Sequence, residues 1–185
     1  MVIFCTIAYN SENYIRKCIE SVLNQTYKEF SYYLIDNGST DKTWSIILEY
    51  SEKDARIIPI HLENNTRGLF SEYVRRAYDE GYQYIATLDS DDWYEPNFLK
   101  EMMELLEKTD ADMVTCGSQL LFEGSKQTLL KRPSDKVICI EKERFSSSFP
   151  YSYPYYGAVW GRVYKVKILV ENNIEYWEGV NYGVD

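Results

Sequence analysis

Three aspartates stand close together in the segment LDSDDWYEP, which covers residues 88–96. Asp89, Asp91 and Asp92 directly follow the apolar run YIATL. Like charges at this spacing repel one another, so the segment requires either a nearby cation or full solvation. Carboxylate oxygens suit Mg²⁺ and Mn²⁺, which are often bound through one or two carboxylates together with substrate phosphates. A solvated acidic loop at the start of a helix is the alternative, and the D-x-D pattern alone does not decide between them.

Two other polar segments also follow apolar runs. AYNSEN, residues 8–13, comes at the end of the run at residues 2–8, and DNGSTD, residues 36–41, comes after the run at residues 30–35. In open parallel α/β sheets, ligands bind outside the carboxyl ends of the strands. We therefore expect both segments to meet the acidic segment at one edge of a sheet.

The elements that would position these segments alternate along the chain. Apolar runs predict strands, and apolar residues at helical spacing predict helices between them, the second of which we expect to be capped by Ser or Thr near its start. The predicted strands are 2–8, 30–35, 56–62, 82–88 and 111–117, and the predicted helices are 10–25, 39–53, 66–81 and 95–108. This order predicts βαβ units with right-handed crossovers and a mostly parallel sheet. We expect residues 119–124 and 136–141 to pair as an antiparallel extension, and residues 162–173 to pass from a strand into a helix.

Composition excludes several classes of function. The chain has 185 residues, a net charge of −9 and no Lys/Arg cluster, which argues against nucleic acid or anionic lipid as the main partner. Four cysteines without a CxxC spacing and a single histidine do not make a zinc site. GxGxxG and GxxxxGK[ST] are absent, and Trp93 occupies a ligand position of a calcium loop. The apolar run at the N-terminus is too short to span a membrane, so we expect neither a transmembrane segment nor a signal peptide.

Four motifs together resemble a known family. TIAYN, SVLNQTY, LIDNGSTDKT and TLDSDDWYEPNFL occur in this order within residues 3–99. The arrangement resembles the family-2 glycosyltransferases, inverting enzymes with the GT-A fold. The resemblance implies an α/β three-layer sandwich with a Rossmann-like, mostly parallel sheet and a small antiparallel extension. It also implies a bacterial enzyme that moves a sugar from a nucleoside-diphosphate sugar, with a UDP-sugar favoured, to an acceptor hydroxyl group.

The resemblance further implies roles for individual residues. It assigns nucleotide binding to Thr6, Ala8, Tyr9, Asn37 and Asp89. It makes Asp91 the main ligand of Mn²⁺ or Mg²⁺, with Asp89 sharing the metal or the ribose and Asp92 mainly structural. Residues 158–185 resemble the acceptor-side region, in which the family's Glu-Asp pair reads Val184-Asp185, so Asp185 is the expected general base. We expect Trp93, Tyr94 and Trp160 to form a platform for the acceptor, a saccharide or lipid-linked saccharide.

Two positions depart from the family pattern. Asn37 stands where the family usually has aspartate, and its NH₂ group could donate to N3 of cytosine, so the base becomes less certain while UDP stays first. Val184 replaces the glutamate of the Glu-Asp pair, next to a terminal base. The chain, if a fragment, is therefore expected to bind nucleotide with metal but to transfer sugar poorly.

The predicted organisation is a single domain over residues 1–185, with a nucleotide-binding half at 1–117 and an acceptor-side half at 118–185 that is truncated at its end. An inactive binding module with the same fold is the first alternative function. A nucleotidyltransferase ranks lower, because AYNSENYIRK contains no glycine-rich phosphate loop. The resemblance implies polysaccharide biosynthesis in the cytoplasm, with any attachment to the inner membrane face made through parts outside this chain.

Overall fold

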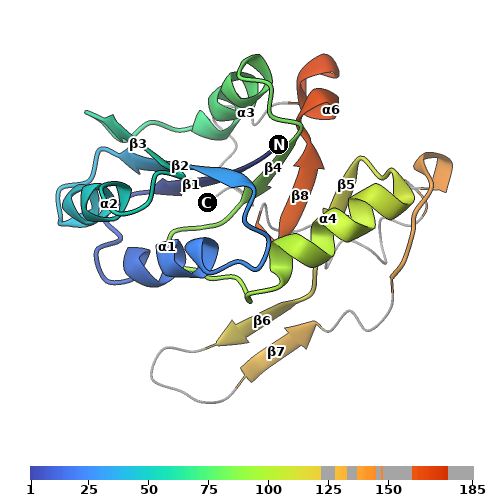
Figure 1. The fold of residues 1–185 in the computed structure, drawn as a ribbon, viewed down its shortest axis with the longest axis horizontal. Coiled ribbons are helices and arrows are strands. Elements are labelled where there is room, and N and C mark those ends of the chain that lie inside the picture. Colours follow the sequence, from blue (N-terminus) through green and yellow to red (C-terminus); the bar gives the residue numbers. More distant parts are fainter. Residues whose placement is uncertain (122–127, 133–136, 145–146, 148–159, 175–185) are drawn as a thin grey trace.

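The computed structural model describes residues 1–121, 128–132, 137–144, 147 and 160–174 (Figure 1). A six-stranded sheet with the order β3-β2-β1-β4-β8-β5 lies at its centre. The strands of this sheet are β1 Val2–Ala8, β2 Phe30–Asn37, β3 Ile57–Leu62, β4 Tyr84–Thr87, β5 Met113–Thr115 and β8 Arg162–Lys165. The helices are α1 Ile15–Leu23, α2 Thr43–Ser51, α3 Leu69–Asp79, α4 Phe98–Thr109 and α6 Val166–Glu171, with a short 3₁₀ turn, η1, at Lys142–Arg144.

The first four strands form a parallel sheet because helices cover both of its faces. β1 and β2 are almost fully buried along their length, as their unbroken apolar runs predict for strands covered on both sides. β1 pairs in parallel with β2 on one side and β4 on the other, and β2 pairs in parallel with β3. This topology brings the carboxyl ends of all four strands to one edge and confirms the predicted mostly parallel α/β fold.

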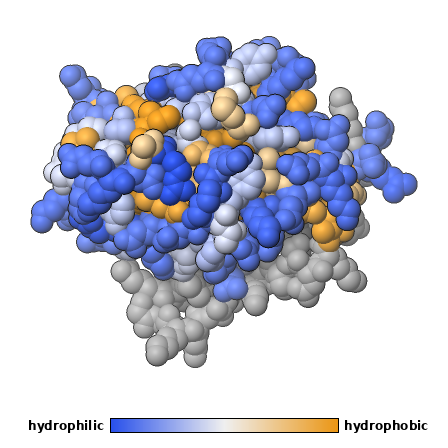
Figure 2. Space-filling view, viewed as in Figure 1, coloured by the Kyte–Doolittle hydropathy of each residue, from blue (hydrophilic) through white to orange (hydrophobic). Residues whose placement is uncertain are grey.

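Two layers of helices enclose the sheet (Figure 1). One apolar core lies between the sheet and the helices α1, α2 and α4, and a second lies between the sheet and the helices α3 and α6. Buried apolar residues recur along α1 at Ile15, Cys18, Ile19 and Val22, which is the spacing of one helix face. In the same view the surface is mainly hydrophilic, and its apolar side chains lie in small separate areas (Figure 2).

The second half of the chain adds a strand to the same sheet. β8 lies between β4 and β5 and runs antiparallel to both, so the expected division at residue 117 does not divide the sheet. A separate hairpin pairs β6 Ser118–Leu121 with β7 Thr128–Arg132. The prediction that residues 136–141 form the partner strand was wrong. Pairing with β7 closes a shorter loop, which costs less chain entropy.

The helices begin later than the sequence pattern suggests. α1 starts at Ile15 and α2 at Thr43, because the polar residues before them form hydrogen bonds to neighbouring loops. α2 has Lys42 at its N-cap without a side-chain cap, so the expected Ser or Thr cap was wrong. Asp41 instead accepts a hydrogen bond from the backbone N–H of Thr43 at 2.9 Å. Among the described residues, no helix is both long and apolar enough to cross a membrane.

Candidate active site

The loop after β1 is joined to the loop after β2. Asn10 has a positive φ of 49°, and its backbone N–H donates to Ser39 Oγ at 2.9 Å. Its side-chain Oδ1 in turn accepts from the backbone N–H of Thr40 at 2.8 Å. These two hydrogen bonds connect residues that are 29 and 30 positions apart in the sequence. The predicted convergence of these two polar segments is therefore confirmed.

Ser11 connects the first polar segment to the acidic segment and to the start of α2. Its backbone N–H donates to Thr43 Oγ1 at 2.8 Å, on the first turn of α2. Its hydroxyl shares a hydrogen bond of 2.7 Å with the hydroxyl of Ser90, inside the acidic segment. Ser11 was not among the predicted site residues, although it stands next to Tyr9 and Asn10 in the same motif. The signal that could have found it is that hydroxyl groups occur in each of the three segments.

A second set of contacts secures the base of these loops. The backbone N–H of Glu12 donates to Asp41 Oδ2, and the backbone N–H of Lys42 donates to Glu12 Oε2, each at 3.0 Å. Burial acts to raise the pKa of Asp41, but the hydrogen bonds from Thr43 and from the backbone of Glu12 outweigh burial and lower it. These contacts therefore stabilise the ionised form of Asp41.

The acidic segment places its three carboxylates in different environments. Asp91 is exposed, whereas Asp89 and Asp92 are half-buried. The backbone N–H of Asp92 donates to the carbonyl oxygen of Asp89 at 3.1 Å, which turns the segment tightly. Burial, and secondarily the charge of Asp91, raises the pKa of Asp92. The repulsion that the spacing of the aspartates predicts therefore acts on Asp92, in addition to burial.

A buried cluster of polar side chains from α1, β1 and β2 packs against the acidic segment. The thiol of Cys18 on α1 donates to the carbonyl oxygen of Asp89 at 3.5 Å, and it lies 3.7 Å from Tyr32 Oη. Tyr32 donates its own hydroxyl hydrogen to Thr6 Oγ1 at 2.9 Å. Burial raises the pKa of Cys18 to about 12, so this thiol is a structural donor and not a nucleophile.

The predicted nucleotide-binding residues of β1 occupy two environments. Thr6 and Ala8 are fully buried, so in this structure they shape the site from within the sheet. Tyr9, the next residue, is 47% exposed and lies beyond the end of β1. Nucleotide binding by Thr6 and Ala8 stays a prediction, and Tyr9 is the residue of the three whose ring is accessible.

Asn37 is joined to the loop between β3 and α3. Its Oδ1 accepts the backbone N–H of Thr66 at 2.8 Å, and its Nδ2 donates to the carbonyl oxygen of Thr66 at 2.9 Å. Only 6% of Asn37 is exposed. No local pattern indicated this contact, because Thr66 lies 29 positions away in the chain.

Asp36 and His61 form a pair at the same edge of the sheet. They are partners in the β2–β3 register, and His61 Nδ1 lies 2.8 Å from Asp36 Oδ2. The His61 ring also packs on Trp44 of α2, with ring centroids 4.9 Å apart. Asp36 is fully buried, and its Oδ1 has no hydrogen-bond partner in the described part of the chain. These contacts indicate a structural role for His61.

Tyr94, one of the three residues of the predicted acceptor platform, has partners within the protein. Tyr94 is buried and stacks on Phe98, and its hydroxyl donates to the Thr87 carbonyl oxygen and accepts the N–H of Gly161 at 2.9 Å. Contact of Tyr94 with the acceptor stays a prediction, and in this structure the side chain packs in the core. Its ring fills the core between α4 and the sheet, and its hydroxyl joins β4 to the start of β8.

Trp93 and Trp160 differ from Tyr94 in their exposure. Trp93 is 36% exposed, and Lys17 Nζ lies 2.9 Å from its ring centroid, so one face of the ring is covered by a cation. Trp160 is half-buried, next to Gly161, which binds Tyr94. The roles of both tryptophans stay predictions. The expected general base, Asp185, lies outside the described residues.

The acidic segment fits a divalent cation that is shared with a ligand. Among the residues that the structure describes, no group of three or more His, Cys, Asp or Glu side chains could hold a metal ion. A complete protein cage for a metal is thus absent from this part of the chain. The donors at hand are the hard oxygens of Asp89 and Asp91, which match the one or two carboxylates with which proteins commonly bind Mg²⁺ beside phosphates.

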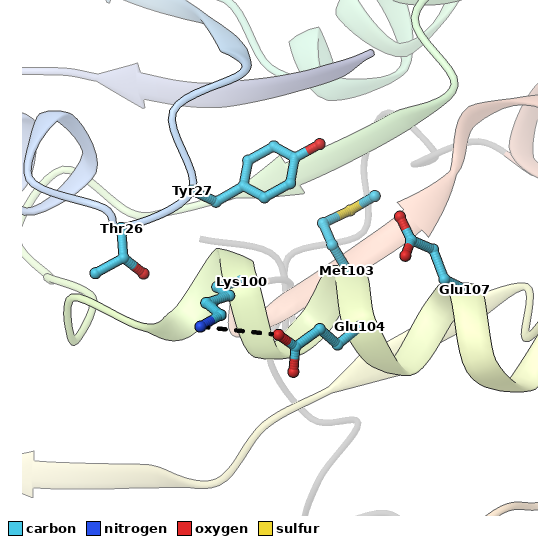
Figure 3. Close-up of a pocket in the computed structure, with 6 residues that line it drawn as sticks. All are labelled: Thr26, Tyr27, Lys100, Met103, Glu104 and Glu107. Carbon is cyan, nitrogen blue, oxygen red and sulfur yellow. Dashed lines mark ion pairs between the residues drawn. The ribbon is translucent and has the colours of Figure 1, made fainter.

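A shallow pocket of about 370 Å³ lies elsewhere, on the flank of α4 (Figure 3). Tyr27 and Thr26, which precede β2, face Met103 across it, and Lys100 and Glu104 form an ion pair of 3.9 Å on its rim. None of its lining residues comes from the three polar segments. We therefore place the candidate active site at the strand ends and not in this pocket.

Comparison with known proteins identifies the family of the chain. The chain matches the family described as Glycosyl transferase family 2 over residues 3–164. Glycosyltransferase GlyA of Streptococcus pneumoniae is 30% identical over 170 residues, covering 87% of this chain and 24% of GlyA. Glycosyltransferase GlyG of the same organism is 28% identical over 134 residues, covering 72% of this chain and 44% of GlyG. The chain thus spans less than half the length of these relatives.

Solved structures share the fold. Staphylococcus aureus TarS, residues 1–349 in complex with UDP, has a TM-score of 0.71 at 22% identity and covers 96% of this chain and 50% of its own. The mannosyltransferase PcManGT of Pyrobaculum calidifontis, in complex with GDP-Man and Mn²⁺, has a TM-score of 0.66 at 16% identity and covers 98% of this chain and 49% of its own. At these identities the likeness establishes the GT-A fold.

Proposed function

The chain belongs to glycosyl transferase family 2, and we propose that it moves a sugar from a nucleoside-diphosphate sugar to an acceptor hydroxyl group with inversion. The observation that carries the proposal is the junction of the three polar segments, made by the bonds of Asn10 to Ser39 and of Ser11 to Ser90. It sets amide and hydroxyl groups, from Asn10, Ser11 and Ser39, beside the acidic segment. A nucleoside diphosphate has the same two parts, a neutral base and charged phosphates that a cation can bridge to carboxylates.

A UDP-sugar is the donor that we expect. TarS, which shares the fold, has been crystallised with UDP and with UDP-GlcNAc. The alternative of cytosine rested on donation by the NH₂ group of Asn37. That group already donates to the carbonyl oxygen of Thr66, which supports uracil over cytosine.

Asp91 would hold the divalent cation, and Asp89 would share the cation or bind the ribose. The cation, Mn²⁺ or Mg²⁺, would neutralise the charge that develops on the departing diphosphate. PcManGT has been crystallised with Mn²⁺, which supports metal use in proteins of this fold. The exposure of Asp91 leaves its carboxylate accessible to a ligand that arrives from solvent.

The remaining chemistry falls to groups on the acceptor side. The acceptor hydroxyl would attack the anomeric carbon from the face opposite the leaving diphosphate, and a carboxylate would remove its proton. Asp185 is the proposed base, with Trp93 and Trp160 lining the acceptor. We place the reaction in polysaccharide biosynthesis on the cytoplasmic side of the membrane, with a saccharide or lipid-linked saccharide as acceptor.

Titration calorimetry with UDP, in the presence of Mn²⁺ and again in the presence of a chelator, tests the proposal. We expect binding with Mn²⁺ and its loss with the chelator, because the site is acidic and the ligand is an anion. Release of UDP from UDP-sugars then reports the reaction itself. Failure of UDP, dTDP, GDP and CDP alike to bind with Mn²⁺ would overturn the proposed function.

A further inference from the structure

The motif SVLNQTY, residues 21–27, forms hydrogen bonds to the chain that follows the three aspartates. The hydroxyl of Ser21 accepts the backbone N–H of Tyr94 at 3.2 Å and donates to the carbonyl oxygen of Cys18 at 2.8 Å. Thr26 donates its backbone N–H to the carbonyl oxygen of Pro96 at 2.8 Å and lies beside the start of α4 (Figure 3). The end of α1 is therefore joined to the second part of the acidic segment.

Gln25 makes the buried part of this junction. Its side chain is fully buried, and Nε2 donates to the carbonyl oxygens of Ser21 at 3.0 Å and of Glu95 at 2.8 Å. Its Oε1 accepts the backbone N–H of Leu99 at 2.8 Å. One side-chain amide, with both of its hydrogens and its oxygen in use, thus joins α1, the acidic segment and the first turn of α4.

The bond from Gln25 to Leu99 caps the N-terminus of α4. This helix begins at Phe98 with Asn97 at its N-cap, and Asn97 makes no side-chain cap bond. The first N–H groups of a helix have no partner within the helix, and the N-cap side chain usually accepts one of them. Gln25 accepts one of them from another part of the fold, so the start of α4 is fixed relative to α1.

The same side of α1 also holds the beginning of the acidic segment. Cys18 Sγ donates to the carbonyl oxygen of Asp89 at 3.5 Å, and Cys18 and Ser21 are three positions apart, on one face of the helix. The groups bound by Cys18, Ser21 and Gln25 on the facing chain are all backbone atoms, of Asp89, Tyr94, Glu95 and Leu99. These bonds fix the backbone of the segment without competing with a cation for the carboxylate oxygens of Asp91.

We propose that Gln25 and Ser21 are positioning residues that hold the acidic segment in the arrangement in which it binds the divalent cation. Carboxylates that are already ordered bind a cation more tightly, because less conformational entropy is lost on binding. Residues that orient metal ligands commonly change metal affinity by about 10- to 100-fold when they are replaced. This inference rests on the proposed function, in which the cation joins the segment to the diphosphate.

Two substitutions remove these bonds without adding charge. Gln25→Met keeps about the length of the side chain but has no amide, and Ser21→Ala removes the hydroxyl. In the presence of Mn²⁺ we expect UDP binding to weaken by about tenfold in Gln25→Met and by about threefold in Ser21→Ala. The affinities for dTDP, GDP and CDP should fall by the same factor in each variant, because all four nucleotides share the diphosphate that the cation binds. Calorimetry measures these affinities.

Hydrogen exchange without metal provides a second measurement. Relative to the amides of β1, we expect the amide of Tyr94 to exchange about tenfold faster in Ser21→Ala, and that of Leu99 in Gln25→Met, because each loses its acceptor. Tyr33→Phe is the matched control, since it removes a hydrogen bond to Glu80 on the other face of the sheet. It should lower the free energy of unfolding but change neither the UDP affinity nor the relative exchange of these two amides.

Thermal melting shows whether each variant is folded. If Gln25→Met does not fold, Ser21→Ala decides the test, because its hydroxyl is only partly buried. An unchanged UDP affinity in a folded variant, a loss no larger than that in Tyr33→Phe, or unchanged exchange of the two amides overturns this inference alone. Failure of the unmutated chain to bind any of the four nucleotides overturns the proposed function and is observed before any variant is compared.

Discussion

The polar side chains at the carboxyl ends of β2 and β4 differ in burial and in hydrogen bonding. At the end of β2, Asp36 and Asn37 are buried and bonded to His61 and Thr66 from neighbouring strands and loops. At the end of β4, Asp91 is exposed and has no hydrogen-bond or ion-pair partner within the described ranges. Amides and hydroxyls satisfy one another because each offers donors and acceptors, whereas ionised carboxylates only accept.

This difference gives the ends of β2 and β4 different roles. At the end of β2, the side-chain amide of Asn37 is hydrogen-bonded within the protein, which holds this strand end in one arrangement. The end of β4 concentrates like charges, and burial with the charge of Asp91 raises the pKa of Asp92. We therefore propose that its affinity for an anionic ligand depends on a cation. The following predictions test this division from the largest expected effect to the smallest.

The largest effect is expected at Asp91. Asp91→Asn should weaken Mn²⁺-dependent UDP binding by about 100-fold or more, because it removes a charged ligand from the cation. The free energy of unfolding should change by less than about 0.5 kcal/mol, because the side chain is exposed. Calorimetry and urea denaturation measure the two quantities. Asp79→Asn, an exposed site on α3, is the matched control, and equal binding by both variants would contradict the prediction.

Gly38→Ala should disrupt the packing at the carboxyl end of β2. The added Cβ meets the backbone of Asn64 at 2.6 Å in a residue with φ +76°, so we expect the free energy of unfolding to fall by about 2–3 kcal/mol. Gly81→Ala is the control, since φ is +83° there and nothing lies within 4 Å. It should cost only about 1 kcal/mol, from the backbone conformation alone. Equal losses in urea denaturation would mean that the approach of Asn64 is unimportant.

Tyr94→Phe tests whether the Tyr94 hydroxyl stabilises the core or contacts the acceptor. It removes the hydrogen bonds of the Tyr94 hydroxyl to the N–H of Gly161 and to the carbonyl oxygen of Thr87, so it should destabilise the fold by about 1–3 kcal/mol. UDP affinity and the KM for acceptor should not change. Tyr78→Phe, at an exposed tyrosine on α3, is the control for loss of a tyrosine hydroxyl group. A raised KM for acceptor at unchanged stability would restore the platform role.

The smallest effect concerns pH. Burial, and then the charge of Asp91, raises the pKa of Asp92 above its ordinary value of 3.8. The stabilisation from the protonated carboxyl is fully present below that value and is lost as pH rises through the folded-state pKa. Without metal, the free energy of unfolding of Asp92→Asn should therefore rise relative to that of the unmutated chain between pH 4 and pH 7. Mn²⁺ should reduce this difference in stability. Urea denaturation at each pH measures this, and a gap that is constant with pH would contradict it.

Local pattern was enough for the elements and for their order. The apolar runs at β1, β2 and β4 and the helical spacing in α1 and α4 are properties of short segments, and the structure confirms them. The partner of β6 was predicted wrongly, because two later segments had similar pattern and the choice depended on loop closure. The helix starts were displaced because loop residues such as Asn10 and Glu12 bond to distant groups.

By itself, the sequence determined the α/β alternation, the family motifs and the acidic segment, because each depends on residue type at short spacing. Only the tertiary structure decided which side chains in those motifs remain accessible. It buries Tyr94 and Asn37, leaves Tyr9 and Asp91 exposed, and brings Thr66 to the end of β2. The physical reason is that exposure and hydrogen bonding at the strand ends depend on contacts between segments about thirty or more positions apart, which no local pattern encodes.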